Sequence, residues 1–318
     1  MTAPRASVVI PTKNAIKSIR PVLTAVFEQQ LVGGFDVLVI DSGSKDGTLD
    51  VLREFPLRLH QIPASEFSHG GTRNLGASMT SGEFIAFLTH DAQPANPHWL
   101  SKLTEPFELD ASVAGVFGRH LPYPGCDPID ARNLDGHFAN FGERVSIVRI
   151  TSEEDYRRRQ GWYDFFSNNN SALRRAIWSS HPFPAVPMAE DQQWAQLILK
   201  AGYAKAYAPD ALVYHSHSYR PRDWFHRWYD EFAVYHDLDN PGQIRSPVRA
   251  LGYMVLASKG DLGYLRRTLP PGAALRAGVR AVLNNVARGA GGFLGSNYDR
   301  IPRRWRARLS MQHQLVNR

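Results

Sequence analysis

Three acidic positions in the sequence stand where a predicted strand ends or a predicted helix begins. Asp41 closes the run VLVID, Asp91 follows the run FIAFLTH, and Glu190-Asp191 opens a helical stretch after a proline-rich loop. A single acid at such a place is more often a turn residue or a helix cap than a ligand. Three of them at the ligand edge of one sheet indicate a binding or catalytic site. A carboxylate there can accept a hydrogen bond from the N–H of a pyrimidine base or from a ribose hydroxyl.

The elements that must position these acids alternate between strands and helices. Short apolar runs predict buried strands at residues 6–10, 37–40, 57–62, 84–88 and 113–117. Helical patterns lie between them, at residues 16–29, 46–55, 71–80 and from 96 onward. The repeat predicts an α/β fold with a mostly parallel central sheet and helices on both faces. Ligands of such sheets bind beyond the carboxyl ends of the strands, which here are residues 11–14, 41–44 and 89–92.

The second half of the chain contains weaker strand signals and a basic end. Helices are predicted at residues 171–179 and 190–201, with one or two strands at 203–215. Residues 1–218 contain 20 Lys and Arg against 23 Asp and Glu, whereas residues 219–318 contain 17 against 7. The net charge of +7 therefore arises in the last third of the chain. We expect a catalytic domain at residues 1–218 and a helical, basic region at residues 219–318 that contacts the acceptor, an anionic membrane surface or a second copy.

Two features of that basic region bear on its contacts. Trp224, Trp228 and Phe232 recur at helical spacing, which indicates either a packed helix face or a contact with lipid. Arg276, Arg280 and Arg288 follow on an apolar helical pattern. Five arginines then fall between residues 300 and 308. These cations predict either a membrane-surface region or a solvated face that binds nothing.

Composition excludes several classes of protein. The single cysteine, Cys126, excludes an intramolecular disulfide and a cysteine-based zinc finger. The apolar runs are too short to span a membrane, and the first nine residues lack a secretory pattern. No phosphate-loop motif occurs, and Gly289–Gly295 imitates a dinucleotide fingerprint with its last glycine one residue late. We therefore expect a cytoplasmic protein, with peripheral association at the inner face of the plasma membrane.

The motifs VVIPTKN, VLVIDSGSKDGT, FLTHDAQP and AEDQQWA, in this order, resemble glycosyltransferase family two. The resemblance covers residues 6 to about 217 and implies the Rossmann-like GT-A fold and an inverting transfer of sugar. Within that family, residues 67–100 resemble bacterial rhamnosyltransferases that use dTDP-L-rhamnose. The implied acceptor is a hydroxyl of a bacterial surface polysaccharide or of a lipid-linked oligosaccharide precursor.

The resemblance also implies which residues surround the nucleotide-sugar donor. Asp41 would contact the base or ribose, and Arg73 would pair with phosphate, although a core ion pair is the alternative for Arg73. The full predicted donor set is Pro11, Thr12, Asn14, Asp41, Gly43, His69, Arg73, Asn74, His90 and Asp91.

A divalent metal is expected with the donor, because it stabilises the charge that develops on a diphosphate leaving group. Asp91 stands where the family's DxD motif places its metal-binding aspartate. The sequence reads Thr89-His90-Asp91, so the first acid of that motif is missing. His215 and His217 follow an apolar run and would complete the site, unless they only pack at the end of a strand. The expected ion is Mg²⁺ or Mn²⁺.

Asp191 is the predicted general base, which removes the proton of the acceptor hydroxyl as that oxygen attacks the anomeric carbon. Glu190 is expected to orient or cap, since a Glu-Asp pair also suits the dipole of a helix start. Trp162, Asn169, Asn170 and Glu190 are the acceptor-side candidates. The alternatives are core packing for Trp162 and helix capping for Asn170.

Three other functions compete with the rhamnosyl interpretation. The same fold and mechanism can use a UDP-hexose donor. The basic end could belong to a nucleic-acid-binding protein, but three acids at the ligand edge would repel phosphate without a metal, so no nucleic acid partner is expected. The incomplete DxD motif also allows a non-catalytic scaffold. Self-association, forming a homo-oligomer, is expected in the helical C-terminal region if it occurs.

Overall fold

The computed structural model describes residues 3–237 and 242–311 of the 318-residue chain. The chain divides into two compact units. The first contains residues 1–125 and 133–216, and the second contains residues 126–132 and 217–318. Each unit is described by itself below.

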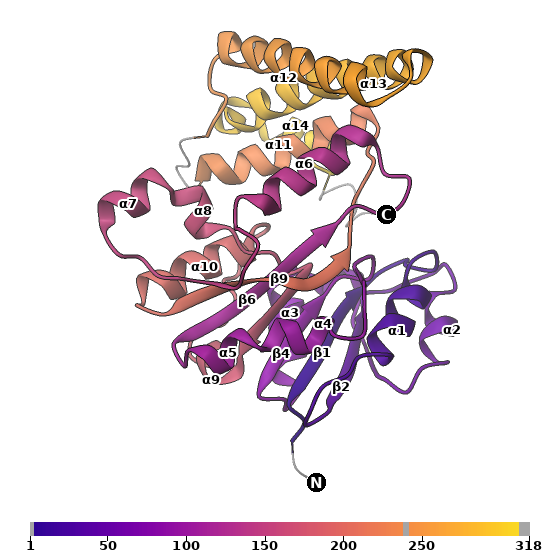
Figure 1. The fold of residues 1–318 in the computed structure, drawn as a ribbon, viewed down its shortest axis with the longest axis vertical. Helices are drawn as coiled ribbons and strands as arrows, with labels where there is room; N and C mark the ends of the chain where they lie inside the picture. Colours follow the sequence, from indigo (N-terminus) through magenta and orange to yellow (C-terminus); the bar gives the residue numbers. More distant parts are fainter. Residues whose placement is uncertain (1–2, 238–241, 312–318) are drawn as a thin grey trace. The chain divides into compact units, whose positions relative to one another are not determined.

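The first unit is built on a nine-stranded mixed sheet (Figure 1). Its strands are β1 (Ala6–Thr12), β2 (Phe35–Asp41), β3 (Arg58–Gln61), β4 (Phe84–Leu88), β5 (Gln93–Pro94), β6 (Val113–Leu121), β7 (Ser146–Val148), β8 (Asn170–Arg174) and β9 (Ala204–Tyr214). The order is β3-β2-β1-β4-β8-β6-β9-β5, with β7 also paired to β9. Strands β1, β2, β3, β4, β6 and β9 run in one direction, and β5, β7 and β8 run against them. The predicted mostly parallel sheet is confirmed.

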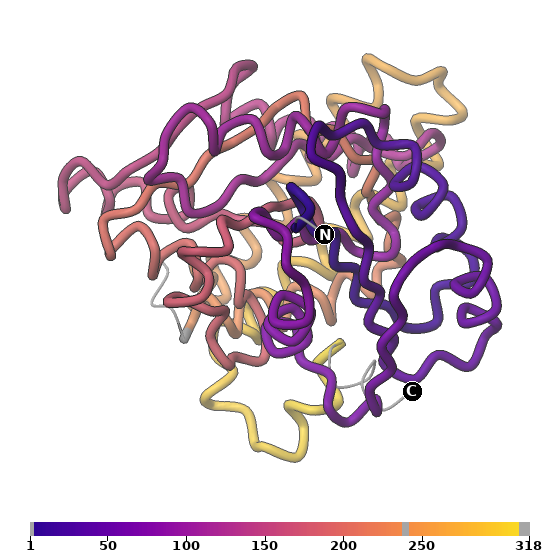
Figure 2. Tube along the Cα trace, turned by 90° about the horizontal axis from the view of Figure 1, so that it is seen from below, coloured from indigo at the N-terminus to yellow at the C-terminus, as the bar shows by residue number. Residues whose placement is uncertain are grey.

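Helices cover both faces of this sheet. They are α1 (Ile19–Phe27), α2 (Thr48–Leu52), α3 (His69–Ser78), α4 (Trp99–Thr104), α5 (Pro106–Leu109), α6 (Pro128–Ala139), α7 (Glu153–Arg158), α8 (Gln160–Asp164), α9 (Arg175–Trp178) and α10 (Glu190–Lys200), with a 3₁₀ turn at Ala64–Glu66. Adjacent residues of β1 enter opposite cores, because side chains alternate along a strand. Val8 packs in the core that contains α1 and α4, and Val9 packs in the core that contains α3 and α10. Figure 2 follows the trace of these first elements in indigo and violet.

One predicted element is wrong in type, and several others differ in length. Residues 171–179 were predicted as a helix, but most of them form β8 and the four-residue helix α9. β8 lies between β4 and β6 and pairs with both, so sheet hydrogen bonds override the local helical preference of the sequence SALRRA. The helix expected from residue 96 begins at Trp99, and the helix expected at 46–55 is limited to α2.

The second unit is helical, as the sequence predicts. It contains α11 (Pro221–Asp237), α12 (Pro247–Thr268), α13 (Pro271–Gly295), a 3₁₀ turn at Tyr298–Arg300 and α14 (Arg303–Leu309), together with the first turn of α6. Trp228 and Phe232 pack with Ile244 and Ala250, which supports the packing interpretation of the aromatic stripe. Among the described residues, no helix combines the length and apolarity needed to cross a membrane.

Glycines let α13 approach its neighbours closely. A Cβ on Gly291 would lie 2.3 Å from the carbonyl oxygen of Phe225, and one on Gly295 would lie 2.4 Å from that of Tyr229. Both carbonyls belong to α11. The glycines that imitate a dinucleotide fingerprint are therefore a helix-packing stripe.

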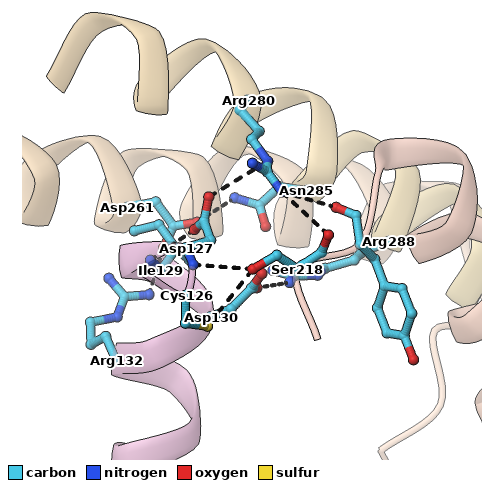
Figure 3. A network of polar contacts seen from close by, with 11 residues as sticks. Cys126, Asp127, Ile129, Asp130, Arg132, Ser218, Asp261, Arg280, Asn285 and Arg288 are labelled. Atoms are coloured by element: carbon cyan, nitrogen blue, oxygen red, sulfur yellow. Dashed lines mark hydrogen bonds and ion pairs between the residues drawn. The ribbon is translucent and has the colours of Figure 1, made fainter. Parts of the chain in front are cut away.

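A polar network ties the segment 126–132 to α12 and α13 within the second unit (Figure 3). Arg288 lies 2.8 Å from Asp130, and Arg132 lies 2.6 Å from Asp261. Asn285 donates a hydrogen bond of 2.7 Å to Asp261. Each of these acids is nearly inaccessible to solvent and has a cationic partner, which offsets the cost of its burial.

Candidate active site

Asp91 and His215 meet at the ligand edge of the first unit. Asp91 lies in the turn between β4 and β5, and His215 directly follows β9. β5 pairs with the end of β9, Gln93 opposite Tyr214, and this register brings the two side chains together. The Nε2 atom of His215 lies 3.6 Å from Oδ1 of Asp91. The pairing of two short strand ends therefore creates a carboxylate–imidazole pair.

Two residues that sequence analysis missed surround this pair. The ring of His120, on β6, lies edge-on to His215 at 5.2 Å between centroids. The hydroxyl of Tyr123 donates a 3.2 Å hydrogen bond to the carbonyl oxygen of Asp91. Burial, reinforced by the charge of Asp91, raises the pKa of Tyr123 to about 12, so this hydroxyl keeps its proton at neutral pH. Both residues lie beyond the strand predicted at residues 113–117, where the sequence pattern is weakest.

The donor atoms at this edge suit a divalent metal. A carboxylate oxygen and an imidazole nitrogen are a ligand combination that Mn²⁺ accepts, and Asp91 and His215 offer both within 4.8 Å. Thr89 stands where the first acid of the DxD motif would be, and its Oγ1 atom is buried without a hydrogen-bond partner among the described residues. A polar ligand beside Asp91 would satisfy such a group. His217 lies two residues further along and belongs to the second unit.

Asp191 occupies the first turn of α10. Its Oδ2 atom accepts a 3.1 Å hydrogen bond from the backbone N–H of Asn168, and Oδ1 accepts one of 2.9 Å from the N–H of Gln192. The preceding residue, Ala189, has a φ of 58°, a left-handed conformation that costs a residue with a Cβ about 1–2 kcal/mol. Such strain is concentrated at functional sites, where the surrounding fold maintains it.

Burial and the neighbouring Glu190 carboxylate raise the pKa of Asp191 well above its ordinary value. Hydrogen bonds from Asn168 and the charge of Arg73 act in the opposite direction. Its hydrogen bonds come from backbone groups, and among the described residues it forms no ion pair. Asp191 is therefore a carboxyl of unusually high basicity.

Asp191 and Asp91 lie at the same edge of the sheet. β8 runs antiparallel to β4, with Asn170 opposite Leu88. The start of β8 therefore lies beside the end of β4, and Asn168, which binds Asp191, just precedes that start. The antiparallel strand that sequence analysis missed is thus the element that connects the two acids.

Arg73 and Glu190 form a buried ion pair, the alternative that the sequence left open. Their Nη1 and Oε1 atoms lie 3.0 Å apart, with side chains 5% and 6% exposed. Glu190 also accepts a 3.1 Å hydrogen bond from the side chain of Asn168. In this structure Arg73 is thus engaged with a carboxylate, and Glu190 precedes Asp191 in the first turn of α10.

Other predicted site residues are also held within the fold. Asn74 accepts from Trp178 Nε1 and the N–H of Phe183 and donates to the carbonyl of Phe183, at 2.9 to 3.0 Å. Asn170 is fully buried, accepts from Trp99 Nε1 and donates to the carbonyls of Arg119 and Ala211. The amide of Asn170 thus has both its hydrogen atoms engaged, whereas Asn74 is half-buried and donates one hydrogen bond.

The two remaining acceptor-side candidates, Trp162 and Asn169, have different surroundings. Trp162 stacks on Phe141 and under the guanidinium of Arg159, which supports its packing interpretation. Asn169 is half-buried and follows Asn168, the partner of Asp191. Of the two, Asn169 is the better placed for contact with an acceptor.

The loops after β1 and β2 bind one another through the predicted nucleotide residues. Oδ1 of Asn14 accepts from the N–H of Lys45 at 2.9 Å, and the N–H of Asn14 donates to Ser44 Oγ at 2.8 Å. The carboxylate of Asp41 accepts from the N–H groups of Gly43 and Ser44, each at 3.0 Å, and from the hydroxyl of Ser44. Asp41 is fully buried and shapes this double loop.

Four further donor candidates occupy the same edge. Pro11 and Thr12 are buried at the end of β1. His69 is the first residue of α3, and its ring lies edge-on to Phe67. His90 is half-buried beside Asp91. The structure thus brings the predicted donor residues to one edge of the sheet and specifies which side chains shape the loops.

Comparisons with known proteins show the family to which the chain belongs. The family model described as glycosyl transferase family 2 matches residues 7–179. The O-antigen chain rhamnosyltransferase RfbN of Salmonella typhimurium is 32% identical over 93% of this chain and 91% of its own length. WbaN of Salmonella anatum, also an O-antigen chain rhamnosyltransferase, is 32% identical over 94% and 91%.

Solved structures share the fold at low sequence identity. A mannosyltransferase from Pyrobaculum calidifontis, PcManGT, in complex with GDP-Man and Mn²⁺, aligns with a TM-score of 0.59 and 18% identity, covering 94% of this chain and 88% of the other. Residues 1–349 of TarS from S. aureus, in complex with UDP-GlcNAc, align with a TM-score of 0.52 and 16% identity, covering 93% and 91%. The predicted GT-A architecture is thereby confirmed.

Proposed function

The chain belongs to glycosyl transferase family 2 and is a glycosyltransferase, and from that premise we propose that it transfers L-rhamnose from dTDP-L-rhamnose with inversion. The acceptor is a hydroxyl of a bacterial surface polysaccharide or of its lipid-linked precursor. The observation that carries this choice is the similarity, over more than nine-tenths of the chain, to two rhamnosyltransferases of O-antigen chains. A UDP-hexose is the alternative donor.

Asp191 is the general base of this proposal. Its ionised carboxylate takes the proton of the acceptor hydroxyl while the acceptor oxygen forms a bond to the anomeric carbon. The bond from that carbon to the nucleoside diphosphate breaks on the opposite face, so the configuration inverts. The high basicity of Asp191 supports the assignment, since a base works best with a pKa near the working pH.

Asp91 and His215 would hold the divalent ion, Mg²⁺ or Mn²⁺. The ion, when bound, offsets the negative charge that develops on the diphosphate leaving group. Tyr123 positions Asp91 by its hydrogen bond to the Asp91 carbonyl. The double loop of Asn14, Asp41 and Gly43 would receive the nucleoside.

The proposal assigns the transferase reaction to residues 1–218 and acceptor contacts to the basic region at residues 219–318. The nucleotide sugar and a glycan or lipid-linked glycan are its partners. In this proposal the reaction takes place in the cytoplasm.

The decisive experiment measures thermal unfolding of the full chain with dTDP, UDP and GDP, each with Mn²⁺ and with a chelator. A ligand at a hundredfold excess over its Kd adds roughly 2.7 kcal/mol to stability, a readily visible shift. The proposal predicts the largest shift with dTDP and Mn²⁺, and predicts that Asp91→Asn removes it whereas the exposed-site control Asp210→Asn does not. A larger shift with UDP would indicate that the donor is a UDP-hexose. No shift with any nucleotide would contradict the proposed site.

A further inference from the structure

The two longest helices of the second unit expose an unusual number of large apolar side chains. Of the thirteen large hydrophobic residues that are exposed in the described chain, eight lie on α12 and α13. Their exposed fractions range from 46% to 80%. The residues are Val248, Leu251, Val255, Leu256, Leu275, Val279, Leu283 and Val286. Exposed apolar side chains gathered on one element mark an interaction surface more often than scattered ones do.

Six of these residues form one continuous surface, which we call the hairpin face: Leu251, Val255, Leu275, Val279, Leu283 and Val286. Two adjacent shallow grooves, of about 600 and 670 Å³, are lined by these six. Leu262, Arg266 and Val282 line both grooves, so the grooves share a border. α12 and α13 lie side by side along this surface (Figure 1).

The charges around the hairpin face are of one sign. The only acid on α12 and α13 is Asp261, which is buried and paired with Arg132. Exposed cations alternate with the apolar residues on both helices, namely Arg249, Lys259, Arg266, Arg267 and Arg276. Lys259 and Arg266 line the grooves themselves.

Two arginines that the sequence assigned to a membrane-surface pattern lie elsewhere. Arg288 is buried in its ion pair with Asp130, and its guanidinium stacks 3.6 Å from the ring centroid of Trp224. Arg280 pairs with Asp127 at 3.6 Å. Arg288 is thus held inside the second unit, whereas Arg280 keeps 43% of its side chain exposed. Neither residue lines the grooves of the hairpin face, which has its own cations.

We propose that the hairpin face docks on an anionic lipid bilayer, lying in the plane of the interface. Aliphatic side chains enter the boundary between headgroups and acyl chains, while the long side chains of Lys259 and Arg266 reach lipid phosphates. A second copy of the chain is the less suitable occupant, because face-to-face pairing would bring two sets of uncompensated cations together. An anionic surface satisfies both the apolar area and the charge.

The test is flotation of the full chain with vesicles of phosphatidylcholine alone and of phosphatidylcholine mixed with phosphatidylglycerol. We expect binding to the anionic vesicles only, weakening as salt is added. Val279→Glu should weaken binding at least tenfold, because it puts a charge in the apolar face. The matched control is Val32→Glu, which makes the same change at a 94% exposed site of the first unit and should bind normally.

The contribution of charge needs its own pair of variants. Lys259→Gln with Arg266→Gln should weaken binding about fivefold for each cation removed. Lys17→Gln with Arg53→Gln removes the same net charge from exposed sites of the first unit and should leave binding unchanged. All variants alter exposed side chains, and circular dichroism checks that each is folded.

Three results would overturn the proposal. The first is no flotation with either vesicle. The second is equal binding by Val279→Glu and Val32→Glu, which would locate the membrane contact elsewhere. The third is a concentration-dependent dimer that Val279→Glu dissociates, without vesicle binding, which would make a second copy the occupant.

Discussion

Each unit of the molecule contains a buried arginine–carboxylate pair of similar geometry, yet the two have different neighbours. Arg73 and Glu190 in the first unit are 3.0 Å apart, and Arg288 and Asp130 in the second are 2.8 Å apart. All four side chains are at most 8% exposed. The second pair belongs to a network in which each acid has its own cation.

The first pair borders an acid that has no cation of its own. Asp191 adjoins Glu190, whose charge is matched by Arg73. Repulsion from Glu190 and burial raise the pKa of Asp191, while Arg73 limits the rise. A buried ion pair by itself therefore indicates stable packing. A buried ion pair beside a further carboxylate that has no cation of its own indicates a catalytic site.

Asp191→Asn should produce the largest effect. Without a base to accept the hydroxyl proton, the rate of sugar transfer should fall about 10²- to 10⁴-fold, whereas Asp210→Asn, at an exposed acid of β9, should retain full activity. Release of nucleoside diphosphate from the donor in the presence of acceptor measures both. Normal turnover by Asp191→Asn would contradict the assignment of Asp191 as the general base.

The same variant should not lose stability at alkaline pH. A carboxyl whose pKa is raised by folding keeps its proton when the unfolded chain has lost it, so stability falls as pH rises from the ordinary value through the raised one. Asp191→Asn has no such dependence. Its free energy of unfolding at pH 8, measured by urea titration, should equal or exceed that of the native chain.

Replacing the arginine of each ion pair distinguishes the functions of the two pairs. Arg73→Met and Arg288→Met should each cost about 3–5 kcal/mol of stability, because each leaves a buried carboxylate unpaired. Among the molecules that remain folded, only Arg73→Met should change the pH dependence of transfer. Since Arg73 lowers the pKa of Asp191, its loss moves the acidic limb of the rate profile to higher pH.

Glu190→Gln should move the pH profile in the opposite direction. It removes the charge that raises the pKa of Asp191, so the acidic limb should move to lower pH. The control is Asp130→Asn in the second unit, which should leave the profile in place. A common shift in both variants would mean that the profile reports folding and not Asp191.

Lys205→Met should produce the smallest effect. Lys205 is a buried lysine whose hydrogen bonds go to backbone carbonyl groups and not to a carboxylate. Its Nζ donates to the carbonyls of Trp162 and Phe165 at 2.9 and 2.6 Å, and burial lowers its pKa to about 7. Below its ordinary pKa the unfolded chain binds a proton that the folded chain does not, so stability declines from pH 10 to pH 7. Lys205→Met should flatten that decline in thermal unfolding curves.

The sequence predicted the strands and the acids of the ligand edge, because buried parallel strands produce continuous apolar runs that end at polar residues. It missed β8, whose residues prefer a helix locally and become a strand only between β4 and β6. Without β8 the connection from Asn168 to Asp191 could not be predicted.

Long-range pairing explains the other omissions. Arg73 and Glu190 are 117 residues apart, and nothing local distinguishes their ion pair from a phosphate contact. His120 meets His215, and Tyr123 meets Asp91, because β6 and β9 pair along their length. Residue types identify candidate chemistry, whereas the sheet register decides which candidates meet.

The central claim is that Asp191 has a raised pKa that allows it to act as the base. Carboxyl ¹³C NMR of the chain labelled at aspartate, titrated with pH, measures that pKa directly, with the Asp191→Asn spectrum assigning the resonance. We predict that the Asp191 resonance titrates well above the ordinary aspartate value of 3.8 and moves further upward in Arg73→Met. Titration of Asp191 at or below 3.8 would contradict the account.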